Sequence, residues 1–205
     1  MNKKRIGLIF IIIGLVGLVV GIAWGEYNIW DSYRAGKEAD RVLQSIVQYR
    51  EEHAAQNEAE ATPDKIPDRQ TEMPTVEIDG YRYIGTVTIP TIDVDLPVME
   101  TWDYTRMKIA PCRYRGSVYS DDLIICGHNY SSHLGRLGNL QTGDQVIFTD
   151  INGTEYQYTV VEKETLDGTA IEQMQSGDWD LTLFTCTLSG QTRTTVRCTS
   201  VKEAS

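Results

Sequence analysis

The stretch IGTVTIPTIDVDLPV, residues 84–98, indicates the fold class. Apolar and polar residues alternate towards Ile89, and they alternate again from Ile92 to Val98. A period of two is typical of β-strands that bury one face. Pro90, which separates the two runs, is typical of a turn. The stretch therefore predicts two consecutive short strands.

Similar short runs continue towards the C-terminus. We expect further strands at 122–126, 144–150, 155–161, 180–187 and 192–201. Asn152-Gly153 lies between two of them and predicts a hairpin with a type I′ turn. From residue 76 onwards, helical patterns are confined to the short stretches 102–108, 132–140 and 169–174. Many short strands separated by turns predict an all-β domain, either a closed barrel or a sandwich.

The N-terminal residues predict a membrane anchor. Lys3, Lys4 and Arg5 are followed by an uncharged apolar run over residues 6–24, long enough to cross about 30 Å of hydrocarbon as a helix. Basic residues stay on the cytoplasmic side, so the remainder of the chain is expected outside the cell. A cleaved signal peptide is the alternative, but its apolar region is usually shorter and ends in small residues.

The chain between the anchor and the strands divides into two parts. Residues 26–59 are expected to be helical because apolar residues recur near a period of 3.6. This helix either continues the membrane helix as a stalk or forms a partly ordered spacer. Residues 56–75 contain three of the six prolines among acidic and polar residues, which predicts a flexible linker. The expected organisation is a basic tail at 1–5, a membrane helix at 6–24, a stalk and linker at 25–75 and one domain at 76–205.

Net charge excludes one class of partner. The chain carries a formal charge of −10 at pH 7, whereas a protein that binds a phosphate backbone needs a basic face. The sequence also lacks an Asp/Asn-rich calcium loop. We therefore expect no nucleic acid partner, no metal site and no cofactor.

Three residues suggest acyl transfer. Cys186 ends a predicted strand, His128 follows another, and Arg193 begins the last. A thiol attacks a carbonyl, an imidazole moves a proton, and a fixed cation stabilises the oxyanion. A papain-type protease is disfavoured because its cysteine precedes its histidine in the chain. The non-enzymatic alternative is a membrane-tethered β-barrel binding module in which the cysteine and the histidine are structural.

Several ordered motifs resemble one family. Thr182-Leu183-Phe184-Thr185-Cys186 resembles the TLxTC motif of sortases, the transpeptidases that attach proteins to the cell wall of Gram-positive bacteria. Gly127-His128 resembles their histidine site, and residues 84–98 resemble their first strands. The resemblance covers about residues 80–201. It implies a closed eight-stranded β-barrel with short helices, preceded by a transmembrane helix and a stalk.

The resemblance also implies roles for individual residues. Cys186 is the expected nucleophile, His128 the proton shuttle and Arg193 the oxyanion donor, while Thr185 is a candidate for positioning the acyl chain. Arg197 lies on the same strand face as Arg193, but the family places its catalytic arginine at the start of this strand, which favours Arg193.

Substrates and subclass follow from the same resemblance. The expected partners are proteins with an LPxTG-like sorting signal, cleaved between Thr and Gly, and the amine of a peptidoglycan precursor. The short connection from Cys186 to Arg193 is most like class D. Pilin-polymerising sortases usually carry a lid with an Asp-Pro-aromatic motif, which is not found here, so wall anchoring is favoured and pilin polymerisation is the alternative.

The remaining cysteines, Cys112, Cys126 and Cys198, leave the redox state open. The domain is large enough to fold without cross-links, so a disulfide-free state is favoured. One hypothesis is a reversible Cys126–Cys186 disulfide, since Cys126 lies two residues before His128 and shares its strand face. The alternative is that Cys126 only fills the wall of the site.

Overall fold

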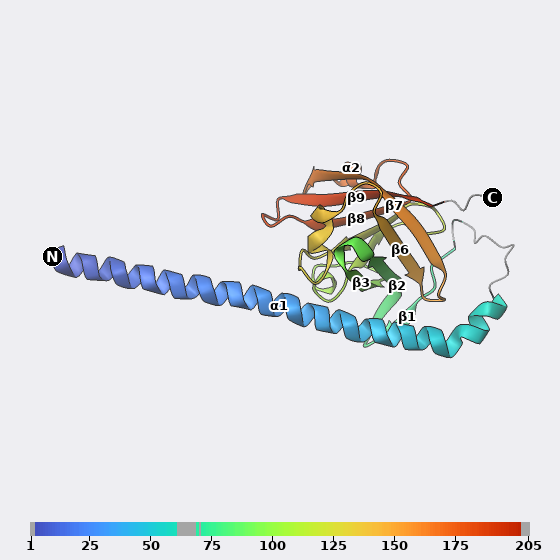
Figure 1. Ribbon diagram of the computed structural model, residues 1–205, viewed down its shortest axis with the longest axis horizontal. Helices are drawn as coiled ribbons and strands as arrows, with labels where there is room; N and C mark the ends of the chain where they lie inside the picture. The colour runs from blue at the N-terminus through green and yellow to red at the C-terminus, as the bar shows by residue number, and fades with distance from the viewer. Residues whose placement is uncertain (1–2, 61–68, 70, 202–205) are drawn as a thin grey trace. The chain divides into compact units, whose positions relative to one another are not determined.

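A computed structural model describes residues 3–60, 69 and 71–201, and the side chains within these ranges except those of 3–6 and 55–60. Most of the predicted linker, at 61–68 and 70, lies outside the described residues. The described chain divides into two compact units, 1–34 and 35–205. The first unit is the N-terminal part of helix α1 (Lys3–Glu60), drawn in blue in Figure 1. Its apolar side chains from Leu8 to Ile22 are exposed, and the segment is long and apolar enough to cross a membrane.

The second unit contains a closed β-barrel. The strands in the described residues are β1 (Val76–Ile78), β2 (Tyr81–Ile89), β3 (Val94–Met99), β4 (Cys112–Arg115), β5 (Leu123–Gly127), β6 (Gln145–Asp150), β7 (Glu155–Asp167), β8 (Leu181–Cys186) and β9 (Thr192–Ser200). They form one sheet in the order β1-β2-β3-β4-β5-β8-β9-β7-β6. Pairing of β6 with β2 closes the strands β2 to β9 into an eight-stranded barrel, and β1 extends one edge of β2. The eight-stranded barrel implied by the family resemblance is confirmed.

A glycine allows the barrel to close. Gly85 lies at an irregularity in the β2–β3 pairing and opposite Asp150 of β6, with φ at +157°. A Cβ atom there would lie 2.2 Å from the carbonyl oxygen of Thr149 and 2.9 Å from the ring of Phe148. Since no side chain fits this approach, glycine is required where β2 meets β6.

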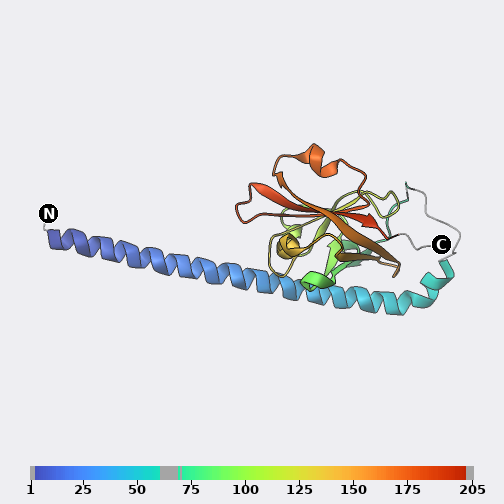
Figure 2. The same cartoon turned by 45° about the horizontal axis from the view of Figure 1, so that its top comes forward.

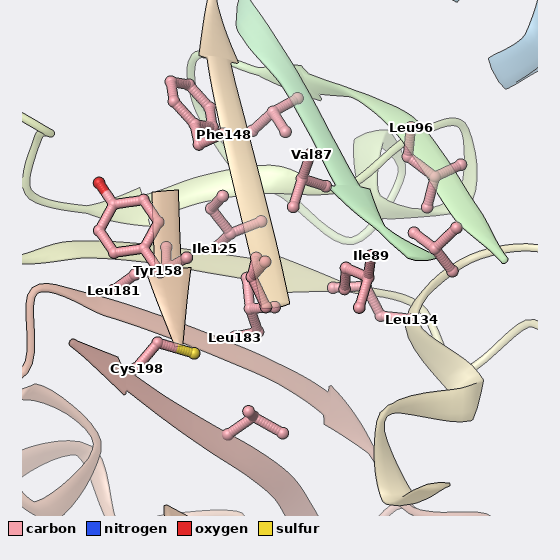
Figure 3. Packing of buried hydrophobic residues seen from close by; sticks show 14 of the residues in the cluster. Val87, Ile89, Leu96, Ile125, Leu134, Phe148, Tyr158, Leu181, Leu183 and Cys198 are labelled. Atoms are coloured by element: carbon pink, nitrogen blue, oxygen red, sulfur yellow. The ribbon is translucent and has the colours of Figure 1, made fainter. Parts of the chain in front are cut away.

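The main core fills the barrel (Figure 3). Alternate residues of β2 and β3, such as Val87, Ile89 and Leu96, point inwards and are at most 3% exposed. They meet Leu181 and Leu183 of β8 and Phe148 of β6. The alternation that predicted the strands is thus the pattern that fills the barrel.

A second core lies where α1 packs on the barrel. Val42 and Ile46 are at most 1% exposed and join a cluster with Tyr83, Met99 and Cys126. Burial of each of these two aliphatic side chains contributes about 2 kcal/mol. Arg50 adds polar contacts, since its guanidinium donates to the carbonyl oxygens of Asp150 and Thr149. The helical segment from Ala35 onwards is therefore part of the same compact unit as the barrel.

Some local predictions differ from the structure. The strands β1 and β4 were not predicted, because β1 is three residues long and β4 carries two arginines. The predicted helices are shorter: 3₁₀ turns occur at η2 (Arg106–Lys108) and η3 (Leu134–Asn139), and an α-helix at α2 (Ile171–Gln175). Another 3₁₀ turn, η1 (Pro90–Ile92), separates β2 from β3. Figure 2 shows α2 (orange) standing out from the strands.

The hairpin at Asn152-Gly153 is confirmed, but the type I′ turn is wrong. The turn spans Asp150 to Gly153, with Gly153 N–H donating to the Asp150 carbonyl. Only Gly153 has a positive φ in this turn, whereas a type I′ turn needs a positive φ at both central residues. Ile151, a central residue, is 1% exposed in the second core, and a β-branched residue avoids positive φ.

Candidate active site

The three candidate catalytic residues lie at the ends of three adjacent strands. Cys186 ends β8 and pairs directly with Arg193 of β9. On the other side of β8, Thr185 pairs with Gly127 of the parallel strand β5. His128 and Cys186 therefore occupy the next position along each strand. The strands β8 and β9 are labelled side by side in Figure 1. The fold brings a thiol, an imidazole and a guanidinium to one edge of the barrel.

Cys186 differs from the other cysteines in exposure. All four lie in the described part of the chain as free thiols, and only Cys186 is partly exposed. Burial raises the pKa of Cys112 and of Cys198 to about 12, and it also raises the pKa of Cys126. Since the thiolate is the nucleophile, buried thiols of this kind react much more slowly at neutral pH than an accessible thiol does. The accessible thiol is the one beside a histidine and an arginine.

The imidazole of His128 stacks on an aromatic ring. The ring of Tyr130 lies 4.0 Å from it between centroids, with 13° between the planes. Tyr130 in turn contacts the ring of His133 edge-on at 5.4 Å. His133 is fully buried, and burial lowers its pKa to about 4. A buried neutral histidine thus supports the ring that stacks on the candidate catalytic histidine.

The backbone after His128 folds tightly. The N–H groups of His133 and Gly135 both donate to the Tyr130 carbonyl oxygen. A Cβ atom on Gly127 would lie 2.8 Å from Leu134, so the lack of a side chain there lets η3 pack against the end of β5. The loop that carries His128 is therefore held by local hydrogen bonds and by packing.

Arg193 and Arg197 have different surroundings. The Arg193 guanidinium donates to the carbonyl oxygens of Gly190 and Thr192, so the turn between β8 and β9 orients it. Arg197 is 2% exposed and donates to Glu164 at 2.8 Å. It also donates to the hydroxyl of Thr182 and to the carbonyl oxygens of Met174 and Gln173 in α2. Only Arg193 of this pair lies opposite Cys186.

Thr185, the candidate for positioning the acyl chain, is 2% exposed. Its hydroxyl donates to the Gly127 carbonyl oxygen at 2.9 Å. This bond joins the end of β8 to the end of β5, immediately before Cys186 and His128. Thr185 thus fixes the relative position of the two strand ends.

An apolar groove of about 220 Å³ leads to Cys186 and Arg193. One wall is aromatic: Trp102, Tyr114 and Phe184 form a chain of ring contacts with centroids 5.3 to 5.4 Å apart, and Tyr104 packs edge-on against Trp102. The other wall comes from the segment between β7 and β8, including α2. Five residues between Asp167 and Met174 line this groove. The aromatic wall was not predicted.

An extended apolar segment fits this groove better than a charged ligand does. The groove is lined mainly by aromatic and aliphatic side chains, with Asp167 and Arg193 as its charged residues. The thiol of Cys186 and the guanidinium of Arg193 lie at one end of this apolar groove. This arrangement suits attack on a carbonyl group of an apolar peptide bound in the groove. In the described residues no cluster of His, Cys, Asp and Glu has the arrangement of a metal site.

Comparisons with known proteins identify the family of this chain. The family model described as the sortase domain matches residues 87–201. Sortase A of Bacillus anthracis is 26% identical over 193 residues, which cover 91% of this chain and 89% of the relative. Sortase D of Bacillus subtilis is 30% identical over 107 residues, or 50% of this chain and 53% of the relative. The structure of a Clostridium perfringens sortase D5 transpeptidase shares the fold, with a TM-score of 0.59 and 16% identity over 81% of this chain and 99% of that one.

Proposed function

This chain belongs to the sortase family of transpeptidases, and from that premise we propose that it cleaves an LPxTG-like sorting signal between Thr and Gly and transfers the acyl group to an amine of a peptidoglycan precursor. The observation that carries the proposal is the register of β5, β8 and β9. Cys186 pairs with Arg193 and both line the apolar groove, while His128 directly follows Gly127, which also lines the groove and pairs with Thr185.

Each residue has one role in the proposed reaction. The Cys186 thiolate attacks the carbonyl carbon of the Thr in the signal, and the negative charge that develops on its oxygen is stabilised by Arg193. His128, as imidazolium, donates a proton to the departing Gly amine, which leaves a thioester on Cys186. An incoming amine then gives a proton to His128 and attacks the thioester, which forms the new amide and frees the thiol.

The groove supports an apolar, extended substrate. We propose that the residues of the signal before the Thr lie along the aromatic wall formed by Trp102, Tyr114 and Phe184. Thr185 acts in this proposal by holding the ends of β8 and β5 together through Gly127. This hydrogen bond keeps the thiol and the imidazole within reach of the same substrate.

We further propose that residues 6–24 cross the membrane once, with the basic tail 1–5 in the cytoplasm and the barrel outside. The uncharged run and the preceding basic cluster support this orientation. Among functional classes we favour wall anchoring of a class D type over pilin polymerisation, because the Asp-Pro-aromatic motif of pilin sortases is not found in the sequence.

The test uses the unit that begins at Ala35, since Val42 and Ile46 complete its second core. Quenched fluorescent LPxTG-type peptides are incubated with this protein, with and without an amine acceptor. We expect cleavage, and a product of acceptor mass that depends on the amine. Cys186→Ala abolishes both, whereas Cys198→Ala, which removes a buried thiol, leaves both. A protein that cleaves no peptide, and whose Cys186 resists alkylation at neutral pH, contradicts the proposal and favours a binding module.

A further inference from the structure

Two buried cysteines face each other beneath the groove. Cys112 of β4 and Cys126 of β5 are direct partners in an antiparallel pair. They are 0% and 1% exposed and belong to the same second core, so their side chains point to the same side of the sheet. Both are free thiols in this structure.

The register suits a disulfide between them. Directly opposed residues in antiparallel strands have Cα atoms about 4.5 or 5.5 Å apart. A disulfide needs Cα atoms roughly 4.4 to 6.8 Å apart. The Cα separation of a directly opposed pair such as Cys112 and Cys126 therefore falls within the range that a disulfide spans.

The register does not suit the alternative Cys126–Cys186 disulfide suggested by the sequence. Cys126 is opposite Phe184, and Cys186 lies two residues further along β8. A step of two residues along a strand, combined with the spacing between strands, separates the two Cα atoms by about 8 Å. That distance exceeds the roughly 7 Å limit for a disulfide without backbone movement. The structure thus pairs Cys126 with Cys112 rather than with the candidate nucleophile.

The position of the pair has a mechanical consequence. The strands β3 and β4 share one register pair, Met99 with Cys112, so this contact is the shortest ladder in the described barrel. Cys126 lines the groove and is followed, two residues later, by His128. A covalent bond between Cys112 and Cys126 would fix β4 to β5 beside that short contact and beneath the groove.

We propose that Cys112 and Cys126 form an oxidisable pair, which closes to a disulfide in the presence of a low-molecular-weight disulfide and fixes β4 to β5. The Cys126 thiolate attacks one sulfur of the reagent, which releases the first small thiol and leaves a mixed disulfide on Cys126. The Cys112 thiolate then attacks the Cys126 sulfur and releases the second small thiol. Two protein thiols are oxidised and one small disulfide is reduced. Burial raises the pKa of both thiols, so closure is slow.

Trypsin separates the four cysteines, which makes the test direct. Cleavage after Lys and Arg places them on the peptides Ile109–Arg113, Gly116–Arg136, Glu164–Arg193 and Cys198–Lys202. The full chain in detergent is incubated with oxidised glutathione, then unfolded in acid, alkylated and digested without reductant. We expect a linked peptide that joins Ile109–Arg113 to Gly116–Arg136, with Cys198 recovered as the alkylated thiol.

Two variants and a melting measurement complete the test. The disulfide closes a loop of about 15 residues, so the melting temperature is expected to rise by roughly 5–10 °C and to return on reduction. Cys112→Ala, which lies outside the groove, loses both the linked peptide and the rise. Cys198→Ala, which removes the cysteine labelled in the main core in Figure 3, keeps both. The proposal is overturned if Cys126 is linked to Cys186, if both Cys112 and Cys126 are recovered alkylated, or if Cys112→Ala shows the same rise.

Discussion

Two neighbouring regions of the barrel each contain a cysteine, a histidine and an arginine. One is the edge formed by the ends of β5, β8 and β9, and the other is the interior beside it. At the edge, Cys186, His128 and Arg193 are partly exposed. Inside, the corresponding residues are Cys198, His133 and Arg197, which are at most 2% exposed. The interior side chains are packed or bonded within the protein, whereas Cys186 and Arg193 at the edge line the groove. Burial, rather than residue type, therefore separates the candidate chemistry from the structural residues.

The arginines give the largest expected difference between the two regions. Arg193→Ala should lower kcat/KM for peptide cleavage by roughly 10²–10³-fold, because the proposed oxyanion donor is lost. Its hydrogen bonds go to carbonyl oxygens of a surface turn, so the melting temperature should stay within a few degrees of the original. Steady-state kinetics and thermal melting of the unit from Ala35 measure both.

Arg193→Lys sharpens this result. Lysine keeps the charge but lacks the planar fork of the guanidinium, so much of the loss should remain. If Arg193→Ala cleaves peptide at the original rate, then Arg193 is not the oxyanion donor. Of Arg193 and Arg197, neither would then act in catalysis at the edge.

The interior arginine should affect stability instead. Arg197→Met should lower the free energy of unfolding by about 3 kcal/mol, because Glu164 and the carbonyl oxygens of α2 lose their buried partner. Urea denaturation of the unit from Ala35 measures this change. Since α2 borders the groove, KM should rise more than kcat falls.

Glu164→Gln is the matched control for Arg197→Met. It removes the ion pair but leaves the bonds from Arg197 to Thr182 and to α2, so the loss should be smaller, about 1 kcal/mol. If Arg197→Met abolishes cleavage while its denaturation curve stays unchanged, the assignment of the two arginines is reversed.

The sequence predicted the edge better than the interior, for a physical reason. Apolar strand patterns and the order of motifs led to the candidates Cys186, which ends β8, and His128, which follows β5, whereas Arg193 was chosen by its place near the start of the last strand. The strand β4 was missed because it has only four residues, two of them arginines, and its pairing with β5 depends on tertiary contacts. Because β4 was not predicted, the sequence could not show that Cys112 and Cys126 lie opposite each other.

Other features depend on contacts between distant parts of the chain. Residues 26–59 are helical, as the 3.6-residue period predicted, but Val42 and Ile46 find their partners in the barrel, which no local pattern specifies. The groove likewise combines Trp102, from the connection between β3 and β4, with Phe184 of β8. Aromatic residues so far apart in sequence show their common function only after folding.

The histidines give the last expected difference between the two regions, and this difference depends on pH. Burial lowers the pKa of His133 to about 4, against about 6.5 for an unfolded histidine. Between these values the unfolded chain binds a proton at this position and the folded protein does not, so acid favours unfolding. The contribution of neutral His133 is fully present above about pH 6.5 and is lost progressively towards pH 4. From pH 8 to pH 5 the loss is about 2 kcal/mol.

His133→Gln tests this by removing the titrating group while keeping a polar side chain. Asp150 acts in the opposite direction, since burial raises the pKa of its carboxyl, but it is present in both proteins and cancels in the comparison. Urea denaturation at pH 8 and at pH 5 should show a drop in the original protein that is about 2 kcal/mol larger than in the variant. If the variant does not fold, the ring protons of His133, followed by NMR in the original protein, should not titrate between pH 8 and pH 5. Two results would contradict this prediction: equal losses of unfolding free energy in both proteins, or titration of His133 near pH 6.5. Either would mean that water reaches the ring of His133. The histidine that contacts Tyr130 would then be no more shielded from water than His128 at the edge.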